Sequence, residues 1–326
     1  MRRLLVCALL SVALYLALFG LALERPLSLG PLRLEMAQKE ARLAALPSPK
    51  LVILAGSNGP FSHSCAVMGK MLDLPCENAG IAVGIGLDEI FARYAPALHA
   101  GDVVYMPMEL EQYAMTRAQY RALVDGALLL RHDPAMLPHL PLGRDVGALF
   151  CCTLADGLEA LAEMPLAGLG FRNGAKMLAA EYDMQGDRVD NDLAGADKTL
   201  LFGPARAAPS AEEIKAGYGT KLIARFVAQE RAKGVVVIGG WPTEFADAKI
   251  SGAARAAVRR VYGAGFLNLP GKSLYQREDF FNSEDHLAKP CQFEHSIAVA
   301  EGLGAMLGRK VNAPGAEVVG VAEECP

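Results

Sequence analysis

Short apolar runs alternate with longer segments of helical spacing along most of the chain. The first run, 51–55, reads as a buried strand, and further strands are expected at 77–80, 103–108, 235–238 and 265–269. Helical spacing follows at 61–72, 87–98, 118–130, 218–233, 246–262 and 290–307. Strands that alternate with helices are typical of a parallel sheet covered on both faces. The pattern therefore predicts an α/β fold, a three-layer doubly wound sandwich.

The start of the chain has a different pattern. From Leu4 to Leu23 the sequence carries no charge and is almost wholly apolar. At about 1.5 Å per residue, such a stretch crosses a ~30 Å hydrocarbon core. A cleaved signal peptide is the alternative, but the run exceeds the usual apolar region and lacks a small-x-small cleavage site after it. We therefore expect a transmembrane helix over residues 1–24, single-pass in the inner (cytoplasmic) membrane, with the folded domain extracytoplasmic (periplasmic).

The remaining chain divides into three parts. Residues 25–49 form a spacer with a short amphipathic helix, residues 50–309 form the α/β domain, and residues 310–326 form a tail. Inside the domain, prolines and a polar, acidic stretch interrupt the pattern between about 131 and 215. Structureless insertions of this length are usually functional or disordered. We interpret this insertion as a lid over a site or as an interaction surface.

Composition narrows the function only a little. The 326 residues are 52% hydrophobic and carry a net charge of −4, which gives no indication of nucleic-acid binding. Of the seven cysteines, Cys7 lies in the expected anchor and the other six permit disulfides. Cys65 and Cys76 flank one helix-to-strand connection and are the favoured pair, with buried free thiols as the alternative. No Cys or His cluster has zinc spacing, so we expect no metal and no cofactor.

The candidate chemistry lies at the expected strand ends. Ser57, Gly80, Glu109 and His286 each follow a predicted strand, and ligands of parallel sheets bind beyond the carboxyl ends of the strands. A serine is weakly nucleophilic until a base such as histidine activates it. The pairing of Ser57 with His286 therefore predicts a serine-hydrolase site. The alternative for Ser57 is a cap of the following helix.

Three blocks in this order resemble the SGNH (GDSL-like) hydrolase superfamily: Gly56-Ser57-Asn58, Asn78-Ala79-Gly80, and a late His286 in a polar loop before a helix. The strand end at Glu109-Leu110-Glu111-Gln112-Tyr113 and the Phe280-Phe281-Asn282 block are similar to its membrane-anchored extracytoplasmic branch. Some members of that branch serve O-acetylation of cell-surface polysaccharides. The resemblance covers roughly residues 50–125 and 218–307 and leaves the insertion unexplained.

The resemblance implies a role for each of these residues. Ser57 is the expected nucleophile and His286 the general base, with Asn282 or Asp285 as the partner of the imidazole. The family supplies an Asn as an oxyanion donor after the third strand, whereas this chain has Glu109, Glu111 and Gln112 there. Gln112 could donate a hydrogen bond, and a glutamate could do so only if it were protonated.

The remaining expectations concern the oxyanion hole and the substrate. The backbone N–H of Ser57 or Asn58 and that of Gly80 would bind the oxyanion, although Gly80 could equally be a turn glycine. Asn78, Glu109 and Trp241 are expected to line the substrate site. His63 is expected to be a packing or rim residue, and His295 at the start of the last helix is expected to be a surface residue.

The sequence as a whole predicts an esterase or O-acyltransferase that acts on acyl (acetyl) esters of a surface glycan. Both share an acyl-enzyme, and the sequence does not separate them. A membrane-bound O-acyltransferase is the implied partner. The main alternative is an inactive relative that binds glycan or scaffolds a membrane complex. A third hypothesis is a nucleotide-binding sandwich. It is disfavoured because the turn at Gly56–Gly59 has neither the GxxxxGK[ST] nor the GxGxxG spacing of phosphate-binding loops.

Overall fold

The computed structural model describes residues 1–22, 29–121, 129, 133–150, 158, 180–269, 271–314 and 325. The chain separates into two compact units. Unit 1 comprises Met1–Ala37, Gly84–Ala92 and Arg117–Ala179, and unit 2 comprises Gln38–Val83, Arg93–Thr116 and Ala180–Pro326. All the candidate chemistry lies in unit 2.

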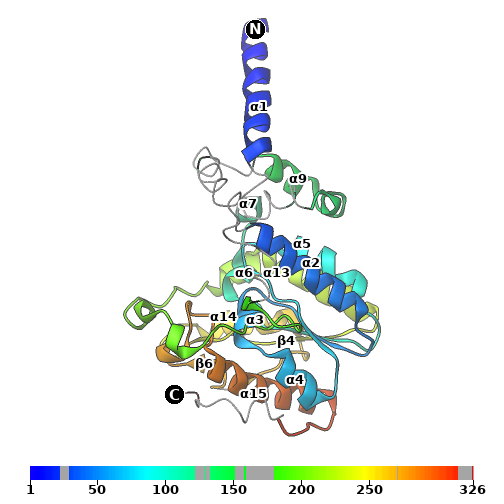
Figure 1. Ribbon diagram of the computed structural model, residues 1–326, viewed down its shortest axis with the longest axis vertical. Coiled ribbons are helices and arrows are strands. Elements are labelled where there is room, and N and C mark those ends of the chain that lie inside the picture. The colour runs from blue at the N-terminus through cyan, green and yellow to red at the C-terminus, as the bar shows by residue number, and fades with distance from the viewer. Residues whose placement is uncertain are drawn as a thin grey trace. The chain divides into compact units, whose positions relative to one another are not determined.

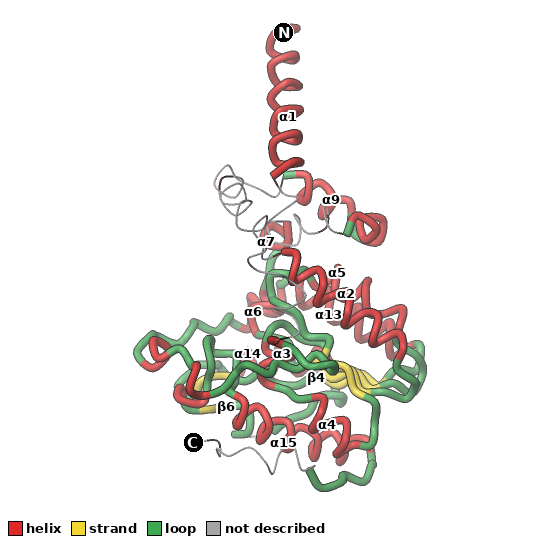
Figure 2. The backbone as a smooth tube through the Cα atoms, in the orientation of Figure 1, coloured by secondary structure: helices red, strands yellow, loops and turns green. Residues whose placement is uncertain are grey.

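A small parallel sheet forms the centre of unit 2. Its four strands stand in the order β2-β1-β3-β4: β1 (Leu51–Ile53), β2 (Cys76–Asn78), β3 (Val103–Met106) and β4 (Val236–Gly239). Since all neighbours are parallel, their carboxyl ends meet at one edge of the sheet. The strand expected at 265–269 is reduced to a single parallel bridge between Gly239 and Phe266. Figure 2 shows how small this sheet is beside the loops of the unit.

Helices cover both faces of the sheet, as expected for an α/β fold. On one face α4 (Cys65–Leu72) and α15 (Lys289–Leu307) pack against Leu51, Ile53 and Tyr105 in one apolar core. On the opposite face lies α13 (Tyr218–Ala232), which contacts β4 (Figure 1). Alternate strand residues point to opposite faces, so both sides of these continuous apolar strands are buried.

Shorter elements complete unit 2. They are α3 (Asn58–Ser62), α6 (Leu110–Ala114), α12 (Ala211–Ala216), α14 (Gly252–Tyr262), the pair β5 (Glu244–Phe245) and β6 (Leu274–Tyr275), and the 3₁₀ turns η1 (Ala95–Ala97), η3 (Leu193–Gly195), η4 (Lys198–Leu201) and η5 (Arg277–Asp279). Two helices cross the division between the units: α2 (Leu29–Ala45) and α5 (Leu87–Tyr94).

The expected transmembrane helix is not supported. Unit 1 contains α1 (Arg2–Ala22), α7 (Arg117–Arg121), the 3₁₀ turn η2 (Pro134–His139) and α9 (Leu142–Leu149). Among the described residues, no helix is long and apolar enough to cross a membrane. The prediction relied on an uninterrupted run to Leu23.

Two predicted helices have different boundaries. The helix expected at 61–72 is divided, because His63 is extended and the Ser64 side chain caps α4 by accepting from Val67 N–H. The helix expected at 246–262 begins at Gly252, where the Ser251 side chain accepts from Ala254 N–H. Of the helix expected at 118–130, most residues lie outside the described part of the chain.

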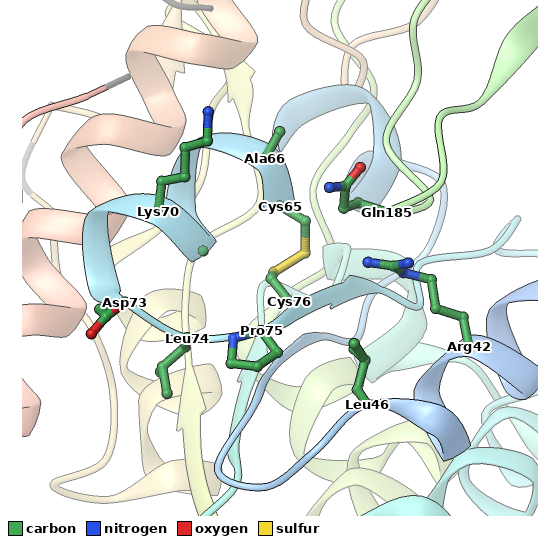
Figure 3. Close-up of a pocket in the computed structure, with 11 residues that line it drawn as sticks. Arg42, Leu46, Cys65, Ala66, Lys70, Asp73, Leu74, Pro75, Cys76 and Gln185 are labelled. Carbon is green, nitrogen blue, oxygen red and sulfur yellow. A yellow bond between two sulfur atoms is a disulfide. The ribbon is translucent and has the colours of Figure 1, made fainter. Parts of the chain in front are cut away.

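Two disulfides stabilise unit 2. Cys65–Cys76 joins the start of α4 to the start of β2, which confirms the favoured pairing. Cys291–Cys325 ties the end of the chain to α15. The bond between Cys65 and Cys76 lines a pocket of about 560 Å³, into which the Arg42 guanidinium also points (Figure 3). Neither Ser57 nor His286 contributes to this pocket.

Candidate active site at the carboxyl edge of the sheet

The serine follows the first strand in a tight turn. We call Gly56–Ser62, which leads from β1 into α3, the Ser57 turn. Ser57 occupies the N-cap position of α3, but its side chain makes no capping hydrogen bond. The hydroxyl is therefore not used to cap the helix, which removes that alternative. It is partly exposed, whereas every other residue of the turn is buried.

His286 contacts this hydroxyl directly. Its Nε2 lies 2.8 Å from Ser57 Oγ, and its Nδ1 lies 2.6 Å from Asn282 Oδ1. An amide oxygen can only accept, so Nδ1 carries the proton and Nε2 presents a lone pair to the serine O–H. This is the tautomer that a general base requires. Of the two proposed partners, Asn282 therefore holds the imidazole.

Asp285 faces away from the imidazole pair. Its carboxylate meets Arg206 at 3.4 Å, and its backbone carbonyl accepts from Ser62 Oγ and Thr243 Oγ1. Burial, followed by the neighbouring Glu111, raises the pKa of Asp285. Asp285 therefore anchors the His286 loop to the core through its own backbone carbonyl, and its carboxylate does not orient the base.

The imidazole of His286 is part of a stack. Its ring lies parallel to that of Phe61, with centroids 3.9 Å apart, and the Arg188 guanidinium lies 4.9 Å from the centre of the Phe61 ring. Burial first, then the cations of Arg188 and Arg206, lowers the pKa of His286 to about 3. Because the imidazolium is disfavoured, the neutral base persists well below neutral pH.

Glu109 lies against the Ser57 turn. Its Oε1 accepts the Asn58 N–H at 3.0 Å, and a Cβ built on Gly56 would be 2.6 Å from the same oxygen. Only a glycine at position 56 allows the carboxyl to approach so closely. One of the two amides expected to bind the oxyanion is thus already engaged. For the Ser57 N–H, no hydrogen-bond partner is found among the described residues.

Gly80 packs against the same turn. A Cβ at this position would lie 2.7 Å from Pro60 and 2.9 Å from the Gly56 carbonyl oxygen. Gly80 does not have a positive φ. Close approach to the Ser57 turn, rather than turn geometry, explains the glycine. Its N–H makes a long, 3.3 Å bond to Asn78 Oδ1.

Asn78 positions the turn rather than a substrate. Its side chain is fully buried, and its Nδ2 contacts the carbonyls of Gly59 and His63 and the Asp187 carboxylate. The other oxygen of Asp187 accepts from Ser64 Oγ and from Ala66 N–H. The substrate contact predicted for Asn78 has no support, because both polar atoms of its side chain are bound within the protein.

A cluster of acids surrounds Glu109. Oxygens of Glu109, Glu111 and Asp285 lie within 4.8 Å of one another. Three carboxylates so close together could hold a cation, and Arg206 supplies one by pairing with Glu111, Asp285 and Glu284. Burial, then the charges of Asp285 and Glu111, raises the pKa of Glu109 well above its ordinary value.

Other predicted residues have structural contacts. Gln112 is buried in the first turn of α6, where its Oε1 accepts from Glu109 N–H. Among the described residues its Nε2 has no hydrogen-bond partner, so donation from Gln112 to an oxyanion stays a prediction. Trp241 is only 5% exposed and lies beneath the guanidinium groups of Arg255 and Arg259, which leaves it no open face for a sugar ring. His63 and His295 are fully buried and in edge-to-face contact, as packing residues. A surface position for His295 was wrong, because it lies on the covered face of α15.

The sequence analysis missed the segment that supports the site. Asp187, Arg188 and Asn191 lie in the predicted insertion, yet they bind Asn78, Phe61 and the backbone of Leu287. The only signal was the density of Asp, Asn and Arg between 186 and 197. Such density is equally typical of a solvated loop, so it could not locate these contacts.

Comparisons with known proteins add no identification. No protein-family model matches this chain, and no curated protein matches it significantly. The functional argument therefore depends on the geometry of the site.

Proposed function

We propose that this protein is a serine-dependent acyl-ester hydrolase or O-acyltransferase that works through an acyl-enzyme on Ser57. The observation that carries the proposal is the chain of hydrogen bonds from Ser57 Oγ to His286 Nε2 and from His286 Nδ1 to Asn282. An orienting residue, a base and a nucleophile in this order are the arrangement of nucleophilic catalysis.

The geometry supports a two-step reaction. The Ser57 hydroxyl transfers its proton to His286 Nε2 as Oγ attacks the acyl carbon. The resulting imidazolium then protonates the departing alcohol oxygen, which leaves the acyl group on Ser57. In the second step His286 takes a proton from water or from an acceptor hydroxyl, the new ester or acid forms, and the proton returns to Ser57. Esterase and transferase differ only in this acceptor.

The substrate class rests on the sequence resemblance. Some members of the SGNH-like branch that the sequence motifs resemble serve O-acetylation of surface polysaccharides, and we propose an acetylated glycan as the ester. A membrane-bound O-acyltransferase would then be the partner in the transferase case. The two disulfides support an oxidising, extracytoplasmic location, since such bonds persist outside the reducing cytosol.

A second candidate function has its own supporting observation. Glu109 occupies the Asn58 N–H, and the imidazole is held by a neutral amide rather than by a carboxylate. A site with an occupied oxyanion amide and no carboxylate behind the base would be expected in a catalytically inactive SGNH-like protein that binds a glycan or scaffolds a membrane complex. This candidate predicts no activated serine.

Labelling by a fluorophosphonate serine probe separates the two candidates. We would treat the full chain, purified with its disulfides intact, alongside Ser57→Ala, His286→Ala and the partly exposed Ser283→Ala. The hydrolase proposal expects labelling of the wild type and of Ser283→Ala, but not of the first two variants. Absence of labelling in folded wild type would favour the binding function.

A further inference from the structure

The carboxyl of Glu109 contacts the segment on which the proposed reaction takes place. Its Oε1 is 3.0 Å from the amide nitrogen of Asn58, the residue next to the nucleophile. The same oxygen packs against Gly56, where a Cβ would lie only 2.6 Å from it. It is 1% exposed, so this contact is made without competing water. Whatever charge Glu109 carries is therefore felt where the tetrahedral oxyanion would form.

The surroundings of Glu109 favour its uncharged form. From α6, Glu111 is a second carboxyl, and from the loop before α15 comes Asp285; oxygens of all three lie within 4.8 Å of one another. The segment before α12 contributes one cation, Arg206, which contacts Glu111, Glu284 and Asp285. Two buried carboxylates at this separation do not both ionise readily, and one of them retains its proton.

A neutral Glu109 has the hydrogen-bonding capacity of a carboxamide. Its Oε1 accepts from Asn58, and the proton on the other oxygen is a donor. An ionised Glu109 would have no donor and would repel a developing negative charge. Two of the backbone amides expected to bind the oxyanion already have acceptors: the Asn58 N–H bonds to Glu109 and the Gly80 N–H to Asn78. The oxyanion therefore needs a further donor, which a protonated Glu109 would supply.

We infer that Glu109, in its protonated form, is a catalytic residue that donates a hydrogen bond to the oxyanion of the acyl-transfer reaction. Together with the Ser57 N–H it completes the oxyanion hole. This inference rests on the proposed function and adds to it a second oxyanion donor and a pH limit. Activity falls when Glu109 ionises, so the rate declines as the pH rises through its pKa.

The test compares Glu109→Gln with Glu109→Ala in the full chain. Gln keeps an accepting oxygen for Asn58 and a neutral donor, whereas Ala removes both. We would measure kcat/KM for p-nitrophenyl acetate and the rate of fluorophosphonate labelling from pH 5 to pH 9. The exposed Glu301→Gln on α15 is the matched control. Thermal melts establish that each variant is folded.

We expect Glu109→Gln to retain the activity of wild type at low pH and to lose its alkaline decline. Glu109→Ala should lose about 10²–10³-fold, the usual effect of removing one oxyanion donor. The inference is overturned if Gln is as damaging as Ala, since Glu109 would then act as an ionised group. It is also overturned if the alkaline decline persists unchanged in Gln.

The same data distinguish failure of the proposed function. If wild type reacts with neither reagent and behaves as Ser57→Ala at every pH, the hydrolase proposal fails and the inference falls with it. If wild type reacts and only the Glu109 results disagree, the hydrolase proposal stands and the role of Glu109 is wrong. An unfolded Ala variant leaves the Gln comparison to decide.

Discussion

The rings of Phe61 and His286 lie parallel, 3.9 Å apart and inclined by only 4°, although they come from opposite ends of the α/β unit. Phe61 belongs to α3, directly after Ser57, while His286 belongs to the loop before α15. The stack therefore fixes the base relative to the nucleophile by apolar contact, independently of the hydrogen bond between them. The Arg188 guanidinium also lies over the Phe61 ring, 4.9 Å from its centre, and brings a positive charge to the same stack.

The charge of Arg188 is predicted to set the acid limit of activity. Since it helps to lower the pKa of His286 to about 3, wild type should keep its base neutral, and should remain active, well below pH 6.5. Arg188→Met should raise that pKa only part of the way towards 6.5, because burial, the larger cause, remains. The acid limb of kcat/KM then moves to higher pH. Arg188→Lys should keep the limb of wild type, and so should Arg309→Met, an exposed control. An unchanged limb in Arg188→Met would contradict this role.

Asn282 is predicted to orient the base. Asn282→Ala removes the acceptor of the Nδ1 proton, so the imidazole can adopt the wrong tautomer, and kcat should fall by about 10²-fold. Asn282→Asp keeps the acceptor, adds a negative charge and should preserve activity while it raises the pKa of His286. Steady-state kinetics with the same ester would show both effects. An Ala variant indistinguishable from wild type would mean that Phe61 alone positions the ring.

Asp187 is predicted to stabilise the Ser57 turn through Asn78. Asp187→Ala leaves the Ser64 hydroxyl and the Ala66 N–H without their acceptor and removes one of the three acceptors of the Asn78 amide. A buried donor left unsatisfied costs about 1–3 kcal/mol, so we expect a loss of at least ~2 kcal/mol in the free energy of unfolding. Urea denaturation measures it. Asp192→Ala, an exposed aspartate of the same segment whose side chain makes no capping bond, is the control and should change little.

The buried pair His63 and His295 is predicted to make the fold sensitive to acid. Burial lowers the pKa of both, to about 4 for His295, and both are neutral in the native protein. Between pH 6.5 and pH 4 the unfolded chain binds protons that the native state does not, so each histidine destabilises the fold as the pH falls. For His295 the loss is about 2 kcal/mol at pH 5.

Comparison of wild type with His295→Gln separates the effect of His295 on the free energy of unfolding from that of the buried carboxyls, which titrate alike in both proteins. The difference in unfolding free energy between pH 7 and pH 5 should be smaller in His295→Gln than in wild type. His99→Gln removes a histidine whose side chain is 63% exposed and should reproduce wild type. Equal pH dependence in His295→Gln and wild type would count against the neutral, buried state of His295.

The sequence by itself determined the alternation of strands and helices, the strand end that carries Ser57, and the pairing of Cys65 with Cys76. These follow from local hydrophobic period and chain neighbourhood, which act over a few residues. The prediction that His286 also follows a strand was wrong, because it lies in the loop between η5 and α15. The sequence also suggested a membrane-spanning start, which the described helices do not support.

Only the tertiary structure decided which groups meet at the site. Ser57 and His286 are 229 residues apart, and the choice of Asn282 over Asp285 depended on a loop whose backbone is anchored by Ser62. Asp187 and Arg188 came from a segment with no periodic pattern, and Glu109 reached Asn58 because Gly56 leaves room for it. Side-chain direction, burial and the proximity of like charges are properties of packing between distant segments, which no local pattern encodes.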